Sequence, residues 1–149
     1  MNIQPDFQEL LKLLEKHRVE YMIVGGYAVA FYGYPRFTKD LDVFYSLTSE
    51  NISSLKKVLI EFGFKEKSLS HDLFEKSNII KIGIEPVRVD FINEIDGVEF
   101  SSAKKSVVKG KYGDVEVTFI GKKDLIKNKK STKRLQDKAD VEKLIGSCL

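Results

Sequence analysis

The chain has almost no cysteine and no long apolar run, and each absence excludes a class of protein. Cys148 is the single cysteine among 149 residues, so an internal disulfide framework is excluded and a reducing compartment is expected. The first residues show neither the basic cluster nor the apolar segment of a secretory signal. No apolar run approaches the roughly 20 residues that a membrane-spanning helix needs. We therefore expect a cytoplasmic protein without a membrane partner.

Net charge and histidine content are also low. A formal net charge of +3 indicates little over the whole chain, although lysines crowd the segment 121–138. His17 and His71 stand apart, each without a second candidate ligand beside it, so we expect no metal site built on histidine. An apolar fraction of 42% and a charged fraction of 32% are ordinary for a globular protein. The length predicts a single domain over residues 1–149.

Two adjacent glycines follow an apolar strand. The run Tyr21–Val24 predicts a buried strand that leads directly to Gly25 and Gly26. Glycines there allow a tight turn and let the backbone approach a ligand closely. The residues 27–32 predict a short buried helix that ends at Gly33. Because a helix start presents free N–H groups and a positive dipole end, this turn is a candidate phosphate site, although two glycines also occur in ordinary turns.

Three aspartates lie on predicted strands. Asp40 and Asp42 are alternate residues of one strand, so they share a face, roughly 6–7 Å apart along the strand. Two such carboxylates repel each other unless a cation lies between them, and oxygen-only ligation suits Mg²⁺ or Mn²⁺. Asp90 lies in the middle of an apolar strand, where a carboxylate needs a partner. The alternative for Asp40 and Asp42 is a pair of outward-facing surface acids. The alternative for Asp90 is a partner of Arg88 or a satisfied acid in the core.

The remaining pattern predicts a mixed α/β (α+β) fold: a mixed β-sheet with helices packed on it and two closing C-terminal helices. Apolar periodicity predicts helices over 5–18, 49–62, 122–130 and 135–145. Strands are expected over 78–84 and 87–93, with a short edge strand over 64–68. A hairpin with strands 106–109 and 115–120 is expected around residues 110–114. For residues 70–77 the sequence pattern does not decide between helix and strand.

These residues together resemble the DNA polymerase β-type nucleotidyltransferase superfamily. The resemblance rests on Gly25, Gly26, Asp40, Asp42 and Asp90. From the glycines to Asp42 the segment is similar, nearly end to end, to the first motif of small prokaryotic members related to toxin–antitoxin nucleotidyltransferases. Two departures are a second glycine where many members have serine, and a longer spacing to Asp40. The C-terminal part also resembles the closing helices of those proteins, through Asp124, Leu125, Ile126, Lys129, Arg134, Asp137 and Asp140.

The resemblance implies nucleotidyl transfer assisted by two Mg²⁺ or Mn²⁺ ions. Asp40 and Asp42 would bridge both ions, and Asp90 would hold the catalytic ion and help to take the proton of an acceptor hydroxyl. The hydroxyl would attack the α-phosphate of a nucleoside triphosphate such as ATP, and pyrophosphate would leave.

The resemblance also implies a nucleotide-binding set. It consists of Gly25, Gly26, Arg36, Thr38 and Lys129. Asp137, which follows Arg134 closely, is expected to orient basic side chains rather than to bind metal. For the lysine-rich segment, a solvated basic face is the alternative. Three tyrosines near the glycines are expected to pack in the core rather than to stack on a base: Tyr27, Tyr32 and Tyr34.

Three functions compete at this point. The first is an enzyme that transfers a nucleoside monophosphate to a hydroxyl on RNA, protein or a small molecule. The second is a catalytically weak, nucleotide-binding antitoxin or regulatory module that acts through a partner chain. The third is a nucleic-acid-binding domain whose affinity depends on its lysine-rich segment and falls steeply with salt.

Overall fold

The computed structural model describes residues 3–34, 40–84 and 87–146. Arg36, Thr38 and Cys148 lie outside these residues, so the predictions that concern them are not addressed by the structure. The helices are α1 (Pro5–Lys16), α2 (Gly25–Phe31), α3 (Ser49–Phe62), α4 (Phe100–Ala103), α5 (Lys122–Lys130) and α6 (Leu135–Gly146). The strands are β1 (Tyr21–Val24), β2 (Asp40–Tyr45), β3 (Ile80–Ile84), β4 (Val87–Ile92), β5 (Val108–Tyr112) and β6 (Val115–Phe119).

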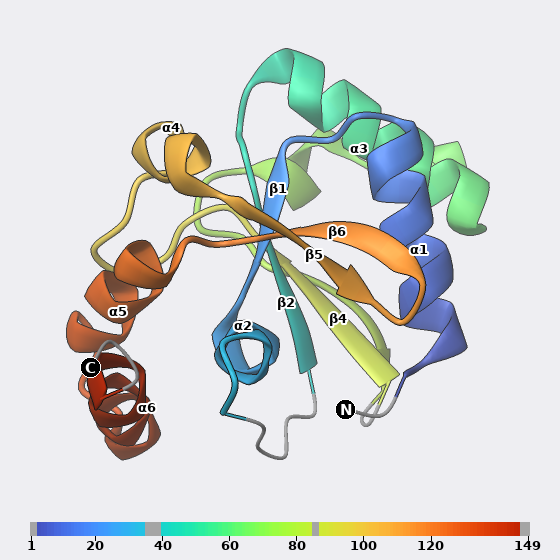
Figure 1. The fold of residues 1–149 in the computed structure, drawn as a ribbon. Coiled ribbons are helices and arrows are strands. Elements are labelled where there is room, and N and C mark those ends of the chain that lie inside the picture. Colours follow the sequence, from blue (N-terminus) through green and yellow to red (C-terminus); the bar gives the residue numbers. More distant parts are fainter. Residues whose placement is uncertain (1–2, 35–39, 85–86, 147–149) are drawn as a thin grey trace.

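One six-stranded mixed sheet organises the described residues, in the order β3-β4-β2-β1-β6-β5. β2 runs parallel to β4 and antiparallel to β1, while β1 is parallel to β6. Helices α1 and α3 lie together on one side of the sheet, and α5 and α6 stand together on the other side of the view (Figure 1). The predicted mixed α/β sheet with packed helices and two closing helices is confirmed.

The core is built from apolar faces that the sequence periodicity predicts. On α1 the buried residues include Phe7, Leu10 and Leu14, and on α3 they include Leu55 and Leu59. Burying one such side chain contributes about 1.5–3 kcal/mol relative to leaving it exposed. All four residues of β1 are also buried. The strand that leads to the glycines is therefore held from both sides, which fixes the position of the turn that follows it.

The glycines lie inside α2 rather than before it, so the helix begins two residues earlier than predicted. Val24 is extended, and Gly25 has φ +68°, a backbone conformation that favours glycine. Tyr27 packs edge-on against Tyr112, with ring centroids 6.0 Å apart. Tyr32 donates a hydrogen bond from its hydroxyl to the Ile120 carbonyl at 2.6 Å. Core packing is thus the structural role of these two tyrosines, as predicted.

The predicted edge strand over 64–68 is wrong, because Glu66–Ser68 forms a 3₁₀ turn. The charged side chains of this segment are exposed, so it offers no apolar face for a sheet to bury. The undecided segment that follows contains a second 3₁₀ turn, His71–Phe74. The sequence pattern also misses α4 and the 3₁₀ turn Lys104–Ser106, both too short to show a helical period.

The first strand of the hairpin lies closer to the turn than predicted: it runs over Val108–Tyr112 instead of residues 106–109, and Ser106 belongs to a 3₁₀ turn. β5 continues to Tyr112, whose hydroxyl accepts a hydrogen bond from the Gln4 backbone N–H at 2.8 Å. The turn is therefore reduced to Gly113 and Asp114, with Gly113 at φ +64°. Burial of the Tyr112 side chain explains why residues 110–112 belong to the strand and not to the loop.

Among the residues described, none of the helices combines the length and the apolar character needed to cross a membrane.

Candidate active site

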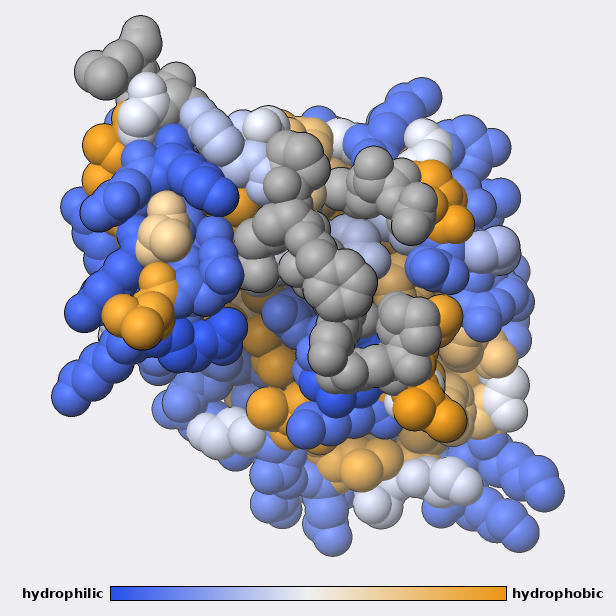
Figure 2. Space-filling view, turned by 90° about the horizontal axis from the view of Figure 1, so that it is seen from below, coloured by the Kyte–Doolittle hydropathy of each residue, from blue (hydrophilic) through white to orange (hydrophobic). Residues whose placement is uncertain are grey.

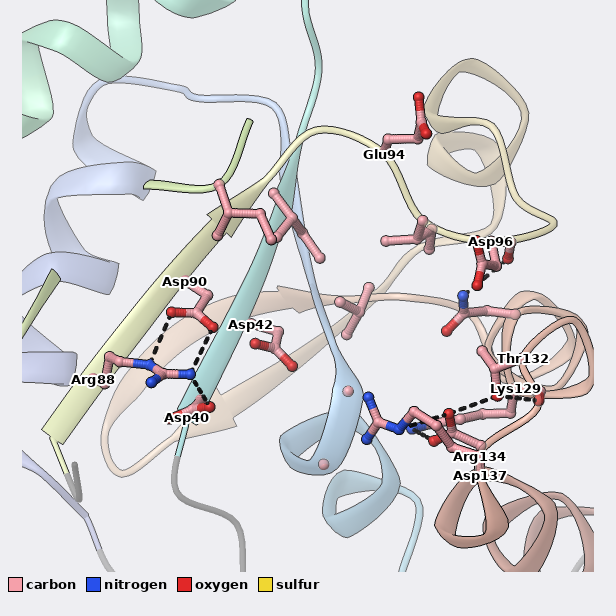
Figure 3. Close-up of a pocket in the computed structure, with 17 residues that line it drawn as sticks. Asp40, Asp42, Arg88, Asp90, Glu94, Asp96, Lys129, Thr132, Arg134 and Asp137 are labelled. Carbon is pink, nitrogen blue, oxygen red and sulfur yellow. Dashed lines mark hydrogen bonds and ion pairs between the residues drawn. The ribbon is translucent and has the colours of Figure 1, made fainter. Parts of the chain in front are cut away.

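A pocket of about 740 Å³ opens between the acidic strands and the C-terminal helices (Figure 3). One wall is formed by β2, β4 and the start of α2, and the opposite wall by α5, α6 and their connection. The volume of the pocket is in the usual range for small-molecule sites. Its charged lining consists of Asp40, Asp42, Arg88, Asp90, Glu94, Asp96, Lys129, Arg134 and Asp137.

The parallel pairing of β2 with β4 gathers the three predicted acids. Asp40 lies beside Arg88 in the register, and Asp42 lies beside Asp90. Because alternate residues of a strand share a face, all four side chains project from the same side of the sheet. The structure thus brings Asp40, Asp42 and Asp90 to one wall of the pocket (Figure 3).

Arg88 lies between two of these acids. Its Nη2 donates to Oδ2 of Asp40 at 2.5 Å and to Oδ2 of Asp90 at 3.2 Å, while its Nε donates to Oδ1 of Asp90 at 3.1 Å. The fork-shaped contact with Asp90 is the strong, geometrically specific kind. The sequence suggested Arg88 as a partner of Asp90. The cross-strand contact with Asp40 follows from the register, which the sequence pattern does not reveal.

Asp42 is the acid with the most perturbed environment. Burial, followed by the negative charges of Asp90 and Asp40, raises its pKa from 3.8 to about 7. The positive charges of Lys129 and Arg134 act in the opposite direction. From the residues that the structure describes, no hydrogen bond or ion pair reaches the Asp42 carboxylate. This wall therefore carries more carboxylate than nearby cation, an imbalance that favours binding of a further cation.

The carboxylate of Asp42 lies directly against the backbone of Gly25. A Cβ atom added to Gly25 would overlap with Oδ2 of Asp42, and the positive φ of this residue would strain any L side chain. Only glycine leaves room for the carboxylate at this turn. Gly25 and Gly26 both line the pocket, so the predicted phosphate turn and the acidic strand share one site.

We expect Gly25→Ala to weaken binding of Mn²⁺ and of ATP at least tenfold, because the new methyl group displaces Asp42 from the pocket wall. Gly33→Ala is the matched control. Gly33 also has a positive φ, of +96°, but a Cβ atom there meets nothing within 4 Å. Both variants are strained, and only the first crowds Asp42. Titration calorimetry on the folded variants compares them, and equal losses of affinity in the two would contradict this reading of Gly25.

The donor set fits a hard divalent cation in its chemistry, since three carboxylates face one pocket with a surplus of negative charge. As it stands, the described part of the chain contains no group of three or more His, Cys, Asp or Glu side chains arranged to hold a metal ion. The Arg88 guanidinium occupies the space between Asp40 and Asp90 (Figure 3). Coordination of metal by the three aspartates therefore stays a prediction.

Lys129, predicted to bind phosphate, is buried among carboxylates. Its Nζ lies 2.7 Å from Oδ1 of Asp137 and 3.4 Å from Oδ2 of Asp140, and its side chain is 5% exposed. Asp137 also accepts a hydrogen bond from Thr132 Oγ1 at 2.7 Å. Burial raises the pKa of Asp137, but the hydrogen bonds from Lys129 and Thr132 more than offset this, so the pKa lies below its usual value. The cluster ties α5 to α6, and contact of Lys129 with a nucleotide stays a prediction.

Arg134 is the cation that the sequence did not single out as a site residue. The Arg134 side chain is 73% exposed, and its Nε lies 3.4 Å from Oδ2 of Asp137. Asp137 therefore orients a basic side chain, as predicted. Figure 3 shows Arg134 extending from the α5–α6 connection toward the start of α2 and the acidic strands. The spacing of three residues between Arg134 and Asp137 was the available signal, because such a pair lies on one face of a helical turn.

The lysine-rich segment presents a hydrophilic surface. Seen from below, the part of the molecule that contains α5 and α6 is mostly hydrophilic (Figure 2). Its exposed lysines are Lys123, Lys127, Lys130, Lys133 and Lys138. A solvated face and a nucleic-acid surface share this appearance, so the nucleic-acid function stays a prediction.

Two solved structures share the fold. A Thermotoga maritima protein crystallised as a candidate nucleotidyltransferase is 15% identical, with a TM-score of 0.62, and the match covers 98% of this chain and 96% of that one. An antigenic nucleotidyltransferase-like protein from Paracoccidioides brasiliensis is 14% identical, with a TM-score of 0.54, over 97% of this chain and 78% of that one. At such identities the likeness shows the fold alone. Neither is described as a toxin or antitoxin, so that part of the resemblance stays a prediction.

No curated protein matches the chain significantly. A protein-family model matches residues 4–146, nearly the whole chain, and its description is "Nucleotidyl transferase of unknown function (DUF2204)". The match spans the glycine turn, all three aspartates and both closing helices. The chain therefore belongs to this nucleotidyl transferase family.

Proposed function

We propose that the protein is a metal-dependent nucleotidyltransferase that moves a nucleoside monophosphate from a nucleoside triphosphate to a hydroxyl acceptor. One observation carries the proposal: β2 and β4 place Asp40, Asp42 and Asp90 on one pocket wall, opposite Arg134. Family membership supports transfer of a nucleotidyl group. RNA, protein and small molecules remain the proposed acceptor classes, and a toxin–antitoxin partner chain is a further proposal.

The three aspartates would hold two Mg²⁺ or Mn²⁺ ions, which when bound polarise the phosphate and acidify the acceptor hydroxyl. Asp90 accepts the hydroxyl proton at a carboxylate oxygen. A bond forms between the acceptor oxygen and the α-phosphorus, and the bond from that phosphorus to the bridging oxygen breaks. The bonding electron pair leaves with pyrophosphate. Asp40 and Asp42 would hold the cations that orient the α-phosphate in line with the acceptor hydroxyl.

The phosphate side of the pocket is formed by Arg134 and the glycine turn. Arginine suits phosphate oxygens because its planar guanidinium presents several N–H donors at once. Gly25 and Gly26 bring backbone close to the same space. Lys129 lines the pocket although its side chain is only 5% exposed, and it contributes its charge there while it holds Asp137 in place.

We expect Arg134→Gln to weaken ATP binding about ten- to a hundredfold, since a charge-assisted hydrogen bond contributes about 1.5–3 kcal/mol. Lys133→Gln is the matched control, because Lys133 is the exposed neighbour of Arg134 and does not line the pocket. Calorimetric titration of ATP in the presence of Mg²⁺ compares the two. Equal losses for both variants would show that only general charge matters.

A second function is favoured by the contacts of Arg88, which already pairs with both Asp40 and Asp90 without a metal. A regulatory module of this kind would bind nucleotide but not transfer it. Titration of ATP into wild type and Asp42→Asn, each with Mg²⁺ and with chelator, separates the two functions. The proposed enzyme binds ATP tightly only with metal and an intact Asp42. Equal binding in all four titrations would favour the regulatory module.

A further inference from the structure

The Arg88 side chain has no role in the reaction described above, although it lies in the middle of the acidic wall. It projects from β4 two residues before Asp90, and its register neighbour on β2 is Asp40. Its guanidinium contacts both carboxylates at hydrogen-bonding distance. Arg88 therefore serves as the counter-ion of two of the three acids in the structure described.

These contacts use the oxygen atoms that a divalent cation would need. Nη2 of Arg88 lies 2.5 Å from Oδ2 of Asp40, and the guanidinium engages both oxygens of Asp90. A metal ion and a guanidinium repel each other and cannot both lie between these carboxylates. Binding of metal by Asp40 and Asp90 thus requires that Arg88 move away.

Arg88 can leave the carboxylates without leaving the pocket. Its side chain is 24% exposed, and it lines the cavity together with Arg134 and the glycine turn. Arginine is a long side chain with a planar fork that matches phosphate as well as carboxylate. A nucleoside triphosphate in the cavity would offer phosphate oxygens to the displaced guanidinium.

We propose that Arg88 is a displaceable counter-ion: it holds Asp40 and Asp90 in the metal-free protein and moves to a phosphate oxygen when metal and nucleotide bind. This inference rests on the proposed function. Displacement of Arg88 couples the binding of metal to the binding of nucleotide, because the metal frees the guanidinium that then contacts the nucleotide. Such coupling is reciprocal, so each ligand strengthens the binding of the other.

The test measures two affinities, one for Mn²⁺ and one for a non-hydrolysable ATP analogue, in wild type, Arg88→Met and Lys81→Met. Without nucleotide, titration of Mn²⁺ monitored by electron paramagnetic resonance is expected to show about 5–150-fold tighter binding to Arg88→Met. With Mn²⁺ present, a non-hydrolysable ATP analogue is expected to bind this variant more weakly than wild type. Lys81 is the register neighbour of Asp90 on β3, but its side chain is exposed and outside the pocket. Lys81→Met is expected to change neither affinity.

The outcomes separate this inference from the proposed function. Mn²⁺ binding to wild type with no gain in Arg88→Met overturns the role of Arg88 and leaves metal-dependent transfer intact. Failure of every variant to bind Mn²⁺, with or without the analogue, overturns both. If Arg88→Met does not fold, Arg88→Lys replaces it, since lysine keeps the charge but lacks the fork. Mn²⁺ affinity of Arg88→Lys above that of wild type supports the inference, and an equal or lower affinity overturns it.

Discussion

Asp42→Asn is expected to reduce nucleotidyl transfer at least a thousandfold while making the metal-free protein more stable above pH 7. The loss of activity follows from the proposed role of Asp42 in holding divalent cations, because a neutral amide lacks the charge that such a ligand would supply. The gain in stability follows from the raised pKa of Asp42, which shows that the ionised carboxylate is unfavourable in the folded protein.

The sign of the stability change depends on pH. The pKa of Asp42 rises from 3.8 to about 7 on folding, so the folded state binds the proton more tightly than the unfolded state. The resulting stabilisation is fully present below about pH 4 and is lost as the pH rises through about 7. A difference of about 3 pKa units corresponds to at most about 4 kcal/mol in the free energy of unfolding. Asparagine, which stays neutral, avoids this loss.

Urea unfolding in chelator at pH 5 and pH 8.5 measures the effect. We expect the advantage of Asp42→Asn over wild type to grow from pH 5 to pH 8.5, by up to a few kcal/mol. Asp72→Asn, at an exposed acid outside the pocket, is the control and is expected to show no such growth. Added Mn²⁺ is expected to stabilise wild type and not Asp42→Asn. An advantage that does not change with pH would contradict the electrostatic account of this site.

Lys129→Met is expected to lower the free energy of unfolding by about 3–5 kcal/mol, because it removes the buried cation that contacts both Asp137 and Asp140. Lys130→Met is the matched control, since Lys130 is the next residue of α5 and is exposed. Its effect is expected to stay within about 0.5 kcal/mol. Urea denaturation at neutral pH compares the two. Similar small effects in both variants would show that the buried cluster does not hold α5 to α6.

Local signals were enough to predict the extent of α3 closely, with Thr48 or Ser49 as the expected cap and an end at about Phe62. The structure has α3 at Ser49–Phe62, as expected from Thr48, which accepts a hydrogen bond from the Asn51 N–H, and from Gly63 at the other end. Strand alternation likewise predicted that Asp40 and Asp42 share a face, because side chains alternate along any strand.

Features that depend on long-range pairing could not be predicted from the sequence. The contact of Arg88 with Asp40 joins residues 48 apart and exists because β2 and β4 are parallel neighbours. Lys129 lies in a run of lysines that the pattern treats alike, and only the packing of α6 against α5 distinguishes it by burial. Arg134 faces the pocket for the same reason. The local sequence shows which residues of a strand alternate. The whole fold determines which strands are neighbours and which helix faces are buried.

The most direct test of the central claim is transfer of label from each of the four α-labelled nucleoside triphosphates. The protein is incubated with Mg²⁺ or Mn²⁺ and a mixture of total RNA and cell protein, beside the Asp40→Ala/Asp42→Ala variant. We predict label on an RNA or protein band with wild type and none with the variant, a result that also identifies the acceptor class. Equal label with both proteins, or none in any lane from protein shown to be folded, would contradict the claim that these aspartates catalyse nucleotidyl transfer.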